Sequence, residues 1–190
     1  MRKSALILGV SAAVAALTAC DRDSGAKGDN KAAGEAATKD DASAKTMAAA
    51  LPANSRFMQA AKAVGLDQTL AGKDSYTVLV ADDAAFAKLP GDWTKPEARA
   101  QVTGILTYHI LPGVVLADDI GKAIDNSKGK AVLATMSGQT LTATREGGKI
   151  VLTDGAGNKA TIGKADEKYS NGVVHHIDAL LSPSRDEQPV

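Results

Sequence analysis

The feature that most constrains this chain is a stretch, residues 21–45, that contains no Leu, Ile, Val or aromatic residue. Such a stretch cannot bury enough apolar surface to offset the entropy lost on folding, so we expect it to be disordered. All six aromatic residues of the chain lie beyond it. We therefore expect one globular domain, formed by residues 46–183, followed by a polar tail at 184–190.

The amino terminus has the organisation of a signal peptide. Arg2 and Lys3 precede an apolar run, residues 5–17, which is too short and alanine-rich to span roughly 30 Å of hydrocarbon. The run closes with the sequence LTAC, ending at the chain's only cysteine, Cys20. Small residues before a lone cysteine resemble the lipobox of bacterial lipoproteins, which implies cleavage after residues 1–19 and a lipid on the Cys20 thiol. The alternative is a plain secretory signal with an incidental cysteine, which would leave an odd free thiol outside the cell.

Residues 20–45 are predicted to be the lipidated cysteine and its tether. A flexible segment of about 25 residues has an end-to-end span of roughly 25 to 30 Å, enough to lift a domain clear of a lipid surface. Two or more acyl chains would anchor it stably. Asp21 resembles the signal that keeps some Gram-negative lipoproteins on the inner membrane. We therefore predict an exported chain, anchored by membrane lipid and facing the periplasm or cell exterior.

Composition excludes other classes of protein. The formal net charge is +0, and no basic stripe interleaved with aromatic residues occurs, so nucleic-acid binding is not expected. With a single cysteine, an internal disulfide is impossible, and the core alone must stabilise the domain.

The first half of the domain is predicted to be mostly helical. Asn54 or Ser55 can cap a helix that ends at Gly65. A strand is expected at 76–81, and Asp82 or Asp83 can cap the short helix after it. Thr94 followed by Glu97 is typical of a capping box and opens a helix whose apolar stripe ends near Tyr108 and His109.

The second half changes to the period of β-strands. Three runs rich in Thr, Val, Ile and Leu are separated by glycine turns, which predicts an antiparallel meander, and one further apolar strand follows. The predicted strands are residues 139–144, 149–154, 158–162 and 173–181. Helices first and hairpins afterwards favour an α+β domain with segregated elements.

Three blocks of this sequence resemble the fasciclin-like domain, in the order in which that family carries them. They are residues 77–86 (TVLVADDAAF), 106–113 (LTYHILPG) and 171–178 (NGVVHHID). The resemblance covers essentially all of residues 46–183. It implies a wedge-shaped antiparallel β-sandwich flanked by several helices, and a role in cell adhesion or extracellular recognition rather than catalysis.

The resemblance also implies roles for individual residues. The Tyr-His pair that the family associates with adhesion is present as Tyr108-His109, which are our candidate partner-binding residues. We expect a structural role for His109 at the helix end and partial exposure of Tyr108. An Asp-Ile pair implicated in integrin binding is replaced here by Asp166-Glu167. The remaining family-motif residues are interpreted as structural: Thr77, Asp83, Phe86, Asn171, Gly172, His175 and Asp178.

Signatures of catalysis and of cofactor binding are weak. His175 and His176 are adjacent on a predicted strand, so they point to opposite faces and cannot both bind one metal ion. Residues 155–160 match the letter of a dinucleotide fingerprint, but a strand follows rather than a helix, which predicts a hairpin turn. The acidic pair Asp118-Asp119 is interpreted as a solvated turn. We expect no enzyme activity, no metal and no cofactor.

The sequence thus predicts a membrane-anchored extracytoplasmic binding or adhesion module. Its expected partner is an envelope or extracellular protein, or a polysaccharide. The alternative left open is a periplasmic carrier of a small apolar ligand, which would require an apolar pocket.

Overall fold

The computed structural model describes residues 44–88 and 95–184. The predicted signal peptide, Cys20 and most of the tether lie outside these residues, as do Thr94 and nearly all of the predicted tail. Among the described residues, none of the helices is long and apolar enough to cross a membrane.

The helices are short, and most belong to the first half of the domain. Ser55 caps the second of them, because its hydroxyl accepts a hydrogen bond from Met58 N–H, and Gly65 ends it with φ +83°. Both features were predicted. Their bounds are α1 Met47–Ala50, α2 Arg56–Val64, α3 Asp67–Ala71, α4 Asp83–Phe86, the 3₁₀ turn η1 Pro96–Ala98, α5 Arg99–Tyr108 and α6 Ala117–Asn126.

Seven strands form one sheet in the order β2-β1-β7-β6-β5-β4-β3. Their bounds are β1 Tyr76–Ala81, β2 Ile110–Pro112, β3 Lys130–Ala134, β4 Thr140–Glu146, β5 Lys149–Thr153, β6 Lys159–Tyr169 and β7 Gly172–Ile177. The α+β class is confirmed. One pair, β1 with β7, is parallel, so the sheet is mixed rather than wholly antiparallel.

The long strand β6 folds the sheet back on itself. Its first part pairs with β5, the rest pairs with β7, and the register shifts twice, between Ile162 and Lys164 and between Lys164 and Glu167. Such irregularities bend a strand and increase its twist. The two free edges of the sheet approach each other where Met136 N–H donates to Ile110 O at 2.8 Å.

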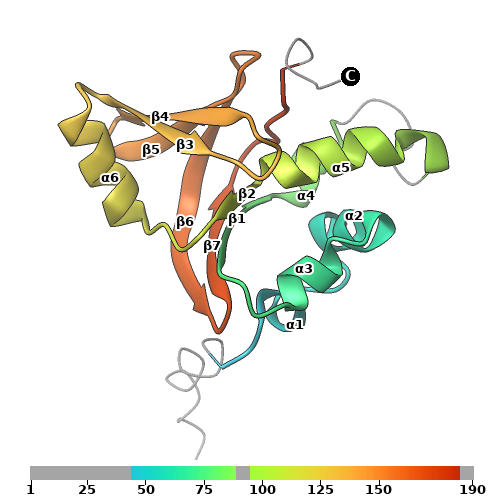
Figure 1. Cartoon of the computed structure of the whole chain (residues 1–190). Helices are drawn as coiled ribbons and strands as arrows, with labels where there is room; N and C mark the ends of the chain where they lie inside the picture. The colour runs from blue at the N-terminus through green and yellow to red at the C-terminus, as the bar shows by residue number, and fades with distance from the viewer. Residues whose placement is uncertain (1–43, 89–94, 185–190) are drawn as a thin grey trace, which may run out of the picture. The chain divides into compact units, whose positions relative to one another are not determined.

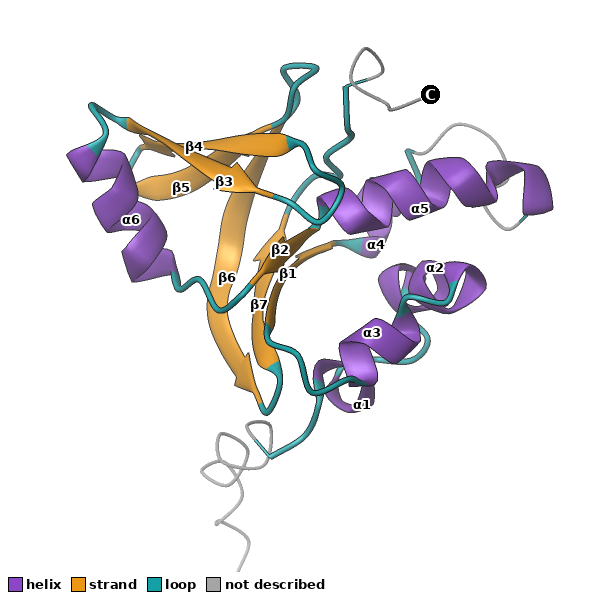
Figure 2. Ribbon diagram, viewed as in Figure 1, coloured by secondary structure: helices purple, strands orange, loops and turns teal. Residues whose placement is uncertain are grey.

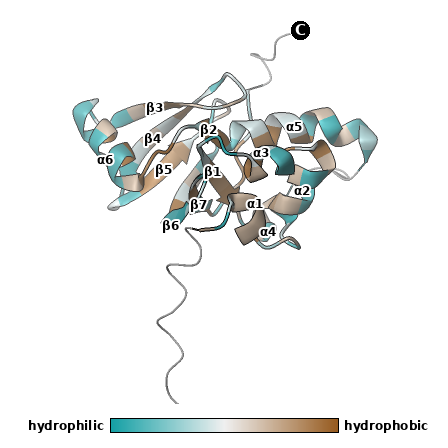
Figure 3. Ribbon diagram, turned by 60° about the horizontal axis from the view of Figure 1, so that its bottom comes forward, coloured by the Kyte–Doolittle hydropathy of each residue, from teal (hydrophilic) through white to brown (hydrophobic). Residues whose placement is uncertain are grey.

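The helices cover the sheet on two sides. Figures 1 and 2 show α1 to α5 gathered beside β1 and β7, while α6 lies beside β3, β4 and β5. One buried core includes residues from Met47, near the start of the described chain, to Leu181, near its end. It contains side chains from both faces of β1. Figure 3 shows this pattern, since β1 and β5 are largely brown and α6 carries teal stretches.

Two helical regions differ from the sequence prediction. Asp118 and Asp119 lie in the first turn of α6 rather than in a loop, because Ile120 and Ile124 pack against the sheet and make the segment helical. The helix predicted to follow Thr94 begins as the 3₁₀ turn η1 and continues as α5, and the capping box expected at Thr94 lies outside the described residues.

Candidate functional site

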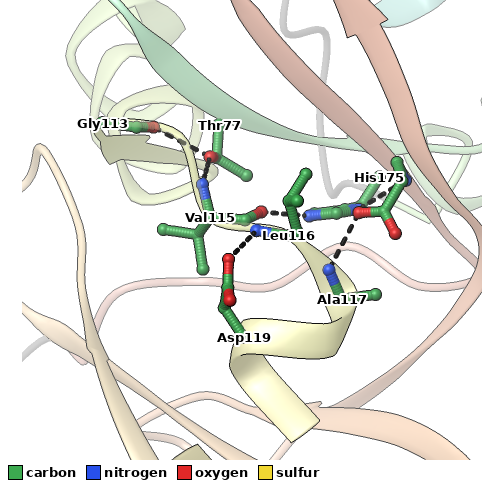
Figure 4. A network of polar contacts seen from close by, with 8 residues as sticks. Thr77, Gly113, Val115, Leu116, Ala117, Asp119 and His175 are labelled. Carbon is green, nitrogen blue, oxygen red and sulfur yellow. Dashed lines mark hydrogen bonds and ion pairs between the residues drawn. The ribbon is translucent and has the colours of Figure 1, made fainter. Parts of the chain in front are cut away.

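Two of the family-motif residues, Thr77 and His175, meet in a network of polar contacts between β1, β7 and the segment that leads into α6. Thr77, fully buried on β1, donates its hydroxyl hydrogen to Gly113 O at 2.8 Å. The same oxygen accepts a hydrogen bond from Val115 N–H, also at 2.8 Å (Figure 4). One hydroxyl therefore holds residues 113–115 against β1.

His175, fully buried on β7, continues this network (Figure 4). Its Nδ1 accepts a hydrogen bond from Asp166 N–H at 3.1 Å, and its Nε2 lies 2.9 Å from Val115 O. A main-chain N–H can only donate and a carbonyl oxygen can only accept, which assigns the neutral tautomer with hydrogen on Nε2. Burial lowers the pKa of His175 below its ordinary 6.5, although the bond to Val115 and the charge of Asp166 oppose this shift.

Asp166 connects His175 to the start of α6. It occupies the irregular part of β6 with φ +60°, which is uncommon for a residue other than glycine. Its Oδ1 accepts a hydrogen bond from Ala117 N–H at 2.8 Å, and this caps the first turn of α6. Sequence reasoning did not find this role. The one signal in the sequence is the acidic pair Asp166-Glu167, which lies inside β6 although Asp and Glu are uncommon in strands.

Asn171 lies in the turn between β6 and β7, and Gly172 is the first residue of β7. Asn171 Oδ1 accepts a hydrogen bond from Met47 N–H at 2.8 Å, and Nδ2 donates to Leu70 O at 2.7 Å and to Gly72 O at 3.0 Å. This buried side chain therefore ties the turn to α1 and α3.

The expectation that Tyr108 is partly exposed is wrong. Its side chain is 0% exposed, and its hydroxyl donates to Thr140 O of β4 at 2.8 Å. The apolar stripe of the helix predicted only the face on which Tyr108 lies. The side chain is buried because β4, which is distant in the sequence, packs against it. The Tyr108 side chain is therefore not available to a partner in the folded domain.

His109, the C-cap residue of α5, is also fully buried and structural. Its Nδ1–H donates to Ile105 O at 2.8 Å, and its Nε2 accepts a hydrogen bond from Leu181 N–H at 3.2 Å. It thereby fastens the carboxyl-terminal segment to α5. Burial lowers the pKa of His109 to about 4, although the bond to Ile105 and the charge of Asp154 oppose this shift.

The remaining motif residues also make internal contacts. Asp83 was expected to cap its own helix, but its Oδ1 accepts a hydrogen bond from Arg56 N–H at 2.8 Å and so caps α2. Phe86 packs edge-on against Phe57 with ring centroids 6.2 Å apart.

Asp178 follows β7 and stabilises the neighbouring strand. Its Oδ1 accepts a hydrogen bond from Thr161 N–H of β6 at 2.7 Å. Asp178 thus holds the end of the last strand, in a structural role like that of the other motif residues.

His175 and His176 point to opposite faces of β7, as predicted. His176 is partly exposed, and its Nε2 lies 2.7 Å from Glu167 Oε2. Within residues 44–88 and 95–184, no group of three or more His, Cys, Asp or Glu side chains could hold a metal ion. The residues that mimic a dinucleotide fingerprint form the β5–β6 turn, where Asp154 accepts hydrogen bonds from Ala156 and Asn158 N–H.

Two of the cavities formed by the described residues are open to solvent. The first, of about 330 Å³, is lined by residues that include Asp82, Lys164 and His176. The second, of about 380 Å³, includes Lys88 and Lys159. Neither is the enclosed apolar pocket that a carrier of apolar ligands requires.

Residues 52–183 match the Fasciclin domain family, which is more than half of the chain. The chain belongs to the fasciclin domain family. Fasciclin domains are extracellular or secreted modules, typically non-enzymatic and adhesive, and the matches indicate no enzyme family. The family match therefore agrees with the resemblance of the three sequence blocks, and the observed fold agrees with the fold that this resemblance implies.

Individual relatives extend this result. Protein sll1483 of Synechocystis sp. is 32% identical over 133 residues, which are 68% of this chain and 67% of that protein. The transforming growth factor-beta-induced protein ig-h3 of Sus scrofa is 28% identical over 131 residues, 68% of this chain but 17% of that protein. A FAS1 domain pair from the insect cell adhesion molecule Fasciclin I shares the fold, with a TM-score of 0.63, 18% identity, and coverage of 76% of this chain and 53% of that chain.

The buried His109 predicts a pH dependence of stability. Above pH 6.5 the imidazole is neutral in both the folded and unfolded states, so the full stability is present. Between pH 6.5 and about 4 only the unfolded chain binds the proton, so the free energy of unfolding should fall by about 3 kcal/mol as pH falls through this window.

Urea unfolding at several pH values between 7.5 and 4 checks this expectation. His109→Gln keeps a donor and an acceptor but cannot titrate, so its stability should fall less steeply than that of the wild type. His175 contributes in the same direction in both proteins, and the difference between them isolates His109. Parallel stability curves for the two proteins would contradict the assignment.

Proposed function

We propose that this chain is a lipid-anchored, extracytoplasmic fasciclin module that binds a protein or polysaccharide of the cell envelope or its surroundings. The observation that carries the proposal is the fasciclin match over residues 52–183 in a chain whose amino terminus reads as a lipoprotein signal ending at Cys20. A fold neighbour is described as a cell adhesion molecule, which supports an adhesive role. The proposal needs no cofactor and no nucleic acid.

The place where the tether would join the domain supports display from a membrane. Ser170 N–H donates to Lys45 O at 2.9 Å, so the amino-terminal segment reaches the domain at the β6–β7 turn. Tethered there, the domain would direct its β5–β6 turn, at the other end of β6, away from the lipid. Asp21 favours the inner membrane as the site of anchoring.

Recognition belongs to the surface of the domain rather than to the family motifs. Tyr108, His109, Thr77 and His175 are all fully buried and hydrogen-bonded within the domain. They hold the fold in place, and the surface they support would meet the partner. Among the described residues, the large hydrophobic side chains that are exposed are Val114, Val132 and Met136.

Replacement of Cys20 tests the anchor and the display together. Cys20→Ala should move the protein from the membrane fraction to the soluble fraction, because no acyl chains attach it to lipid. Membrane fractions prepared from cells carrying the variant should then lose binding to immobilised envelope material. The purified variant should still capture that material, because the fold of the domain is unchanged.

Two outcomes would contradict the proposal in different ways. A wild-type protein without acyl mass on Cys20, found wholly in the soluble fraction, would refute the anchor. Failure of both purified proteins to capture any envelope component, while circular dichroism shows them folded, would refute the binding role. Ser24→Ala, in the same segment but without a lipid role, is the matched control and should behave as the wild type.

A further inference from the structure

The Asp166 carboxylate is placed so that two groups can compete for it. Its Oδ1 caps α6 through Ala117 N–H at 2.8 Å and also lies 3.9 Å from His175 Nδ1. In the neutral state Nδ1 carries no hydrogen, because it accepts a hydrogen bond from Asp166 N–H at 3.1 Å. In this state the Asp166 carboxylate is therefore hydrogen-bonded to the helix and not to the imidazole.

Protonation of His175 would change this arrangement at a single atom. A hydrogen on Nδ1 would point at Asp166 N–H, and two donors cannot form a hydrogen bond with each other. The nearest charged acceptor for the new N–H is Asp166 Oδ1. An imidazolium bound to a carboxylate forms a stronger, charge-assisted hydrogen bond than the neutral main-chain N–H of Ala117 offers.

The backbone at Asp166 can follow such a change. Asp166 lies between two shifts of the β6–β7 register, so it is outside the regular ladder of hydrogen bonds. Its φ of +60° costs free energy in a residue that has a Cβ atom, and the present contacts maintain it. Loss of the bond to His175 Nδ1 removes one of those contacts.

Other contacts limit how far the change spreads. His175 Nε2–H continues to donate to Val115 O in either protonation state, and Thr77 holds Val115 N–H independently. Leu116 N–H donates to Asp119 Oδ2 at 3.3 Å within α6. The segment before α6 therefore remains attached to β1 and β7 while the cap at Ala117 is lost.

Charged or titratable groups lie on β6, β7 and α6, the elements around this network, and of these Asp166 and His176 act on His175 directly. On β6 they are Asp166, Glu167 and Lys164, and Glu167 accepts hydrogen bonds from both Lys164 and His176. On β7 the group is His176. On α6 they are Asp118, paired with Lys122, and Asp119. From β1 the nearest polar group of the network is the neutral Thr77 hydroxyl, which binds the same segment. Asp166 is therefore the one carboxylate in this set with an oxygen placed near His175 Nδ1.

We propose that His175 and Asp166 form an acid-sensitive latch on α6: protonation of His175 draws the Asp166 carboxylate from Ala117 N–H to the imidazolium and loosens the first turn of the helix. Because burial lowers the pKa of His175, the latch opens below pH 6.5. The change is local, and the rest of the domain keeps its structure. This inference does not depend on lipid attachment or on the identity of a partner.

Nuclear magnetic resonance of the full chain in mild detergent tests the latch between pH 7.5 and 4.5. The Cε1–H shifts report the protonation of each histidine, and hydrogen-exchange protection factors report each amide. As His175 titrates, protection of the Ala117 amide should fall roughly tenfold or more relative to that of the Val115 amide, which reports the general loss of stability.

Two variants separate the latch from other sources of pH dependence. His176→Gln removes the neighbouring imidazole and should leave the response of Ala117 intact. Asp166→Asn keeps an oxygen for Ala117 N–H but has no charge to attract the imidazolium, so the response should shrink several-fold.

Three results would overturn the proposal. First, protection of the Ala117 amide could stay constant while His175 titrates. Second, it could follow the Cε1–H shift of His176 instead. Third, protection could fall equally at all amides, which indicates global unfolding. If Asp166→Asn does not fold, the wild type and His176→Gln still decide between these outcomes and the latch.

Discussion

Gly172→Ala should destabilise the domain by about 4 kcal/mol or more, a large part of the roughly 5 to 15 kcal/mol that typically stabilises a folded domain. Gly172 has φ +143°, a conformation that L side chains rarely adopt, and a Cβ atom there would lie 1.9 Å from Tyr76 O. The atoms in the way belong to the backbone of β1, which pairs with β7 at this point and cannot move without breaking the sheet.

Urea unfolding followed by circular dichroism measures this effect, and Gly157→Ala is the matched control. Gly157 also has a positive φ, +87°, but a Cβ atom added there would meet nothing within 4 Å, so only the backbone conformation is penalised. We expect the control to lose about 1 kcal/mol. Equal losses in the two variants would show that close approach to β1 is not what selects glycine at position 172.

Asn171→Ala should also have a large effect, about 3 to 5 kcal/mol, because it leaves two buried main-chain groups and one partly buried group without the partner they have now. These groups are Met47 N–H, Leu70 O and Gly72 O. They belong to α1 and to the end of α3, so the variant should loosen both from the β6–β7 turn.

Two further variants make this prediction specific. Asn171→Asp keeps an acceptor for Met47 N–H but cannot donate to Leu70 O or Gly72 O, so it should be destabilised nearly as much as Asn171→Ala. Asn158→Ala removes an amide whose Nδ2 donates to Asp154 within the β5–β6 turn, and it should cost about 1 kcal/mol. If Asn171→Ala lost only about 1 kcal/mol, like Asn158→Ala, then α1 and α3 would not depend on the Asn171 side chain.

Most of the family-motif residues are buried, although Asp83 and Asp178 are exposed, and this changes where recognition should be sought. Thr77, Asn171, His175 and Asp178 each bind main-chain groups of other elements, and their role is to fix the fold. A family that shares such residues can share an architecture while its members recognise different partners. Binding experiments on this protein should therefore substitute exposed residues such as Val132, which is 68% exposed, rather than Tyr108.

Local patterns in the sequence were sufficient for much of the fold. Ser55 and Gly65 mark the ends of α2 because capping depends on residues within one turn of the helix. The glycine turns of the second half separate strands whose alternation is also local. In contrast, α6 was not predicted, since its short apolar stripe becomes decisive only when Ile120 and Ile124 meet the sheet.

The sequence by itself determined the division into an apolar-poor segment and a domain with helices before hairpins, because composition and period depend on neighbouring residues. Only the tertiary structure decided that β4 buries Tyr108, that Asp83 caps α2, and that Asp166 caps α6 while binding His175. Each of these contacts joins residues that are separated in the chain. Whether a side chain is exposed or bonded is fixed by what packs against it, and no local pattern contains that information.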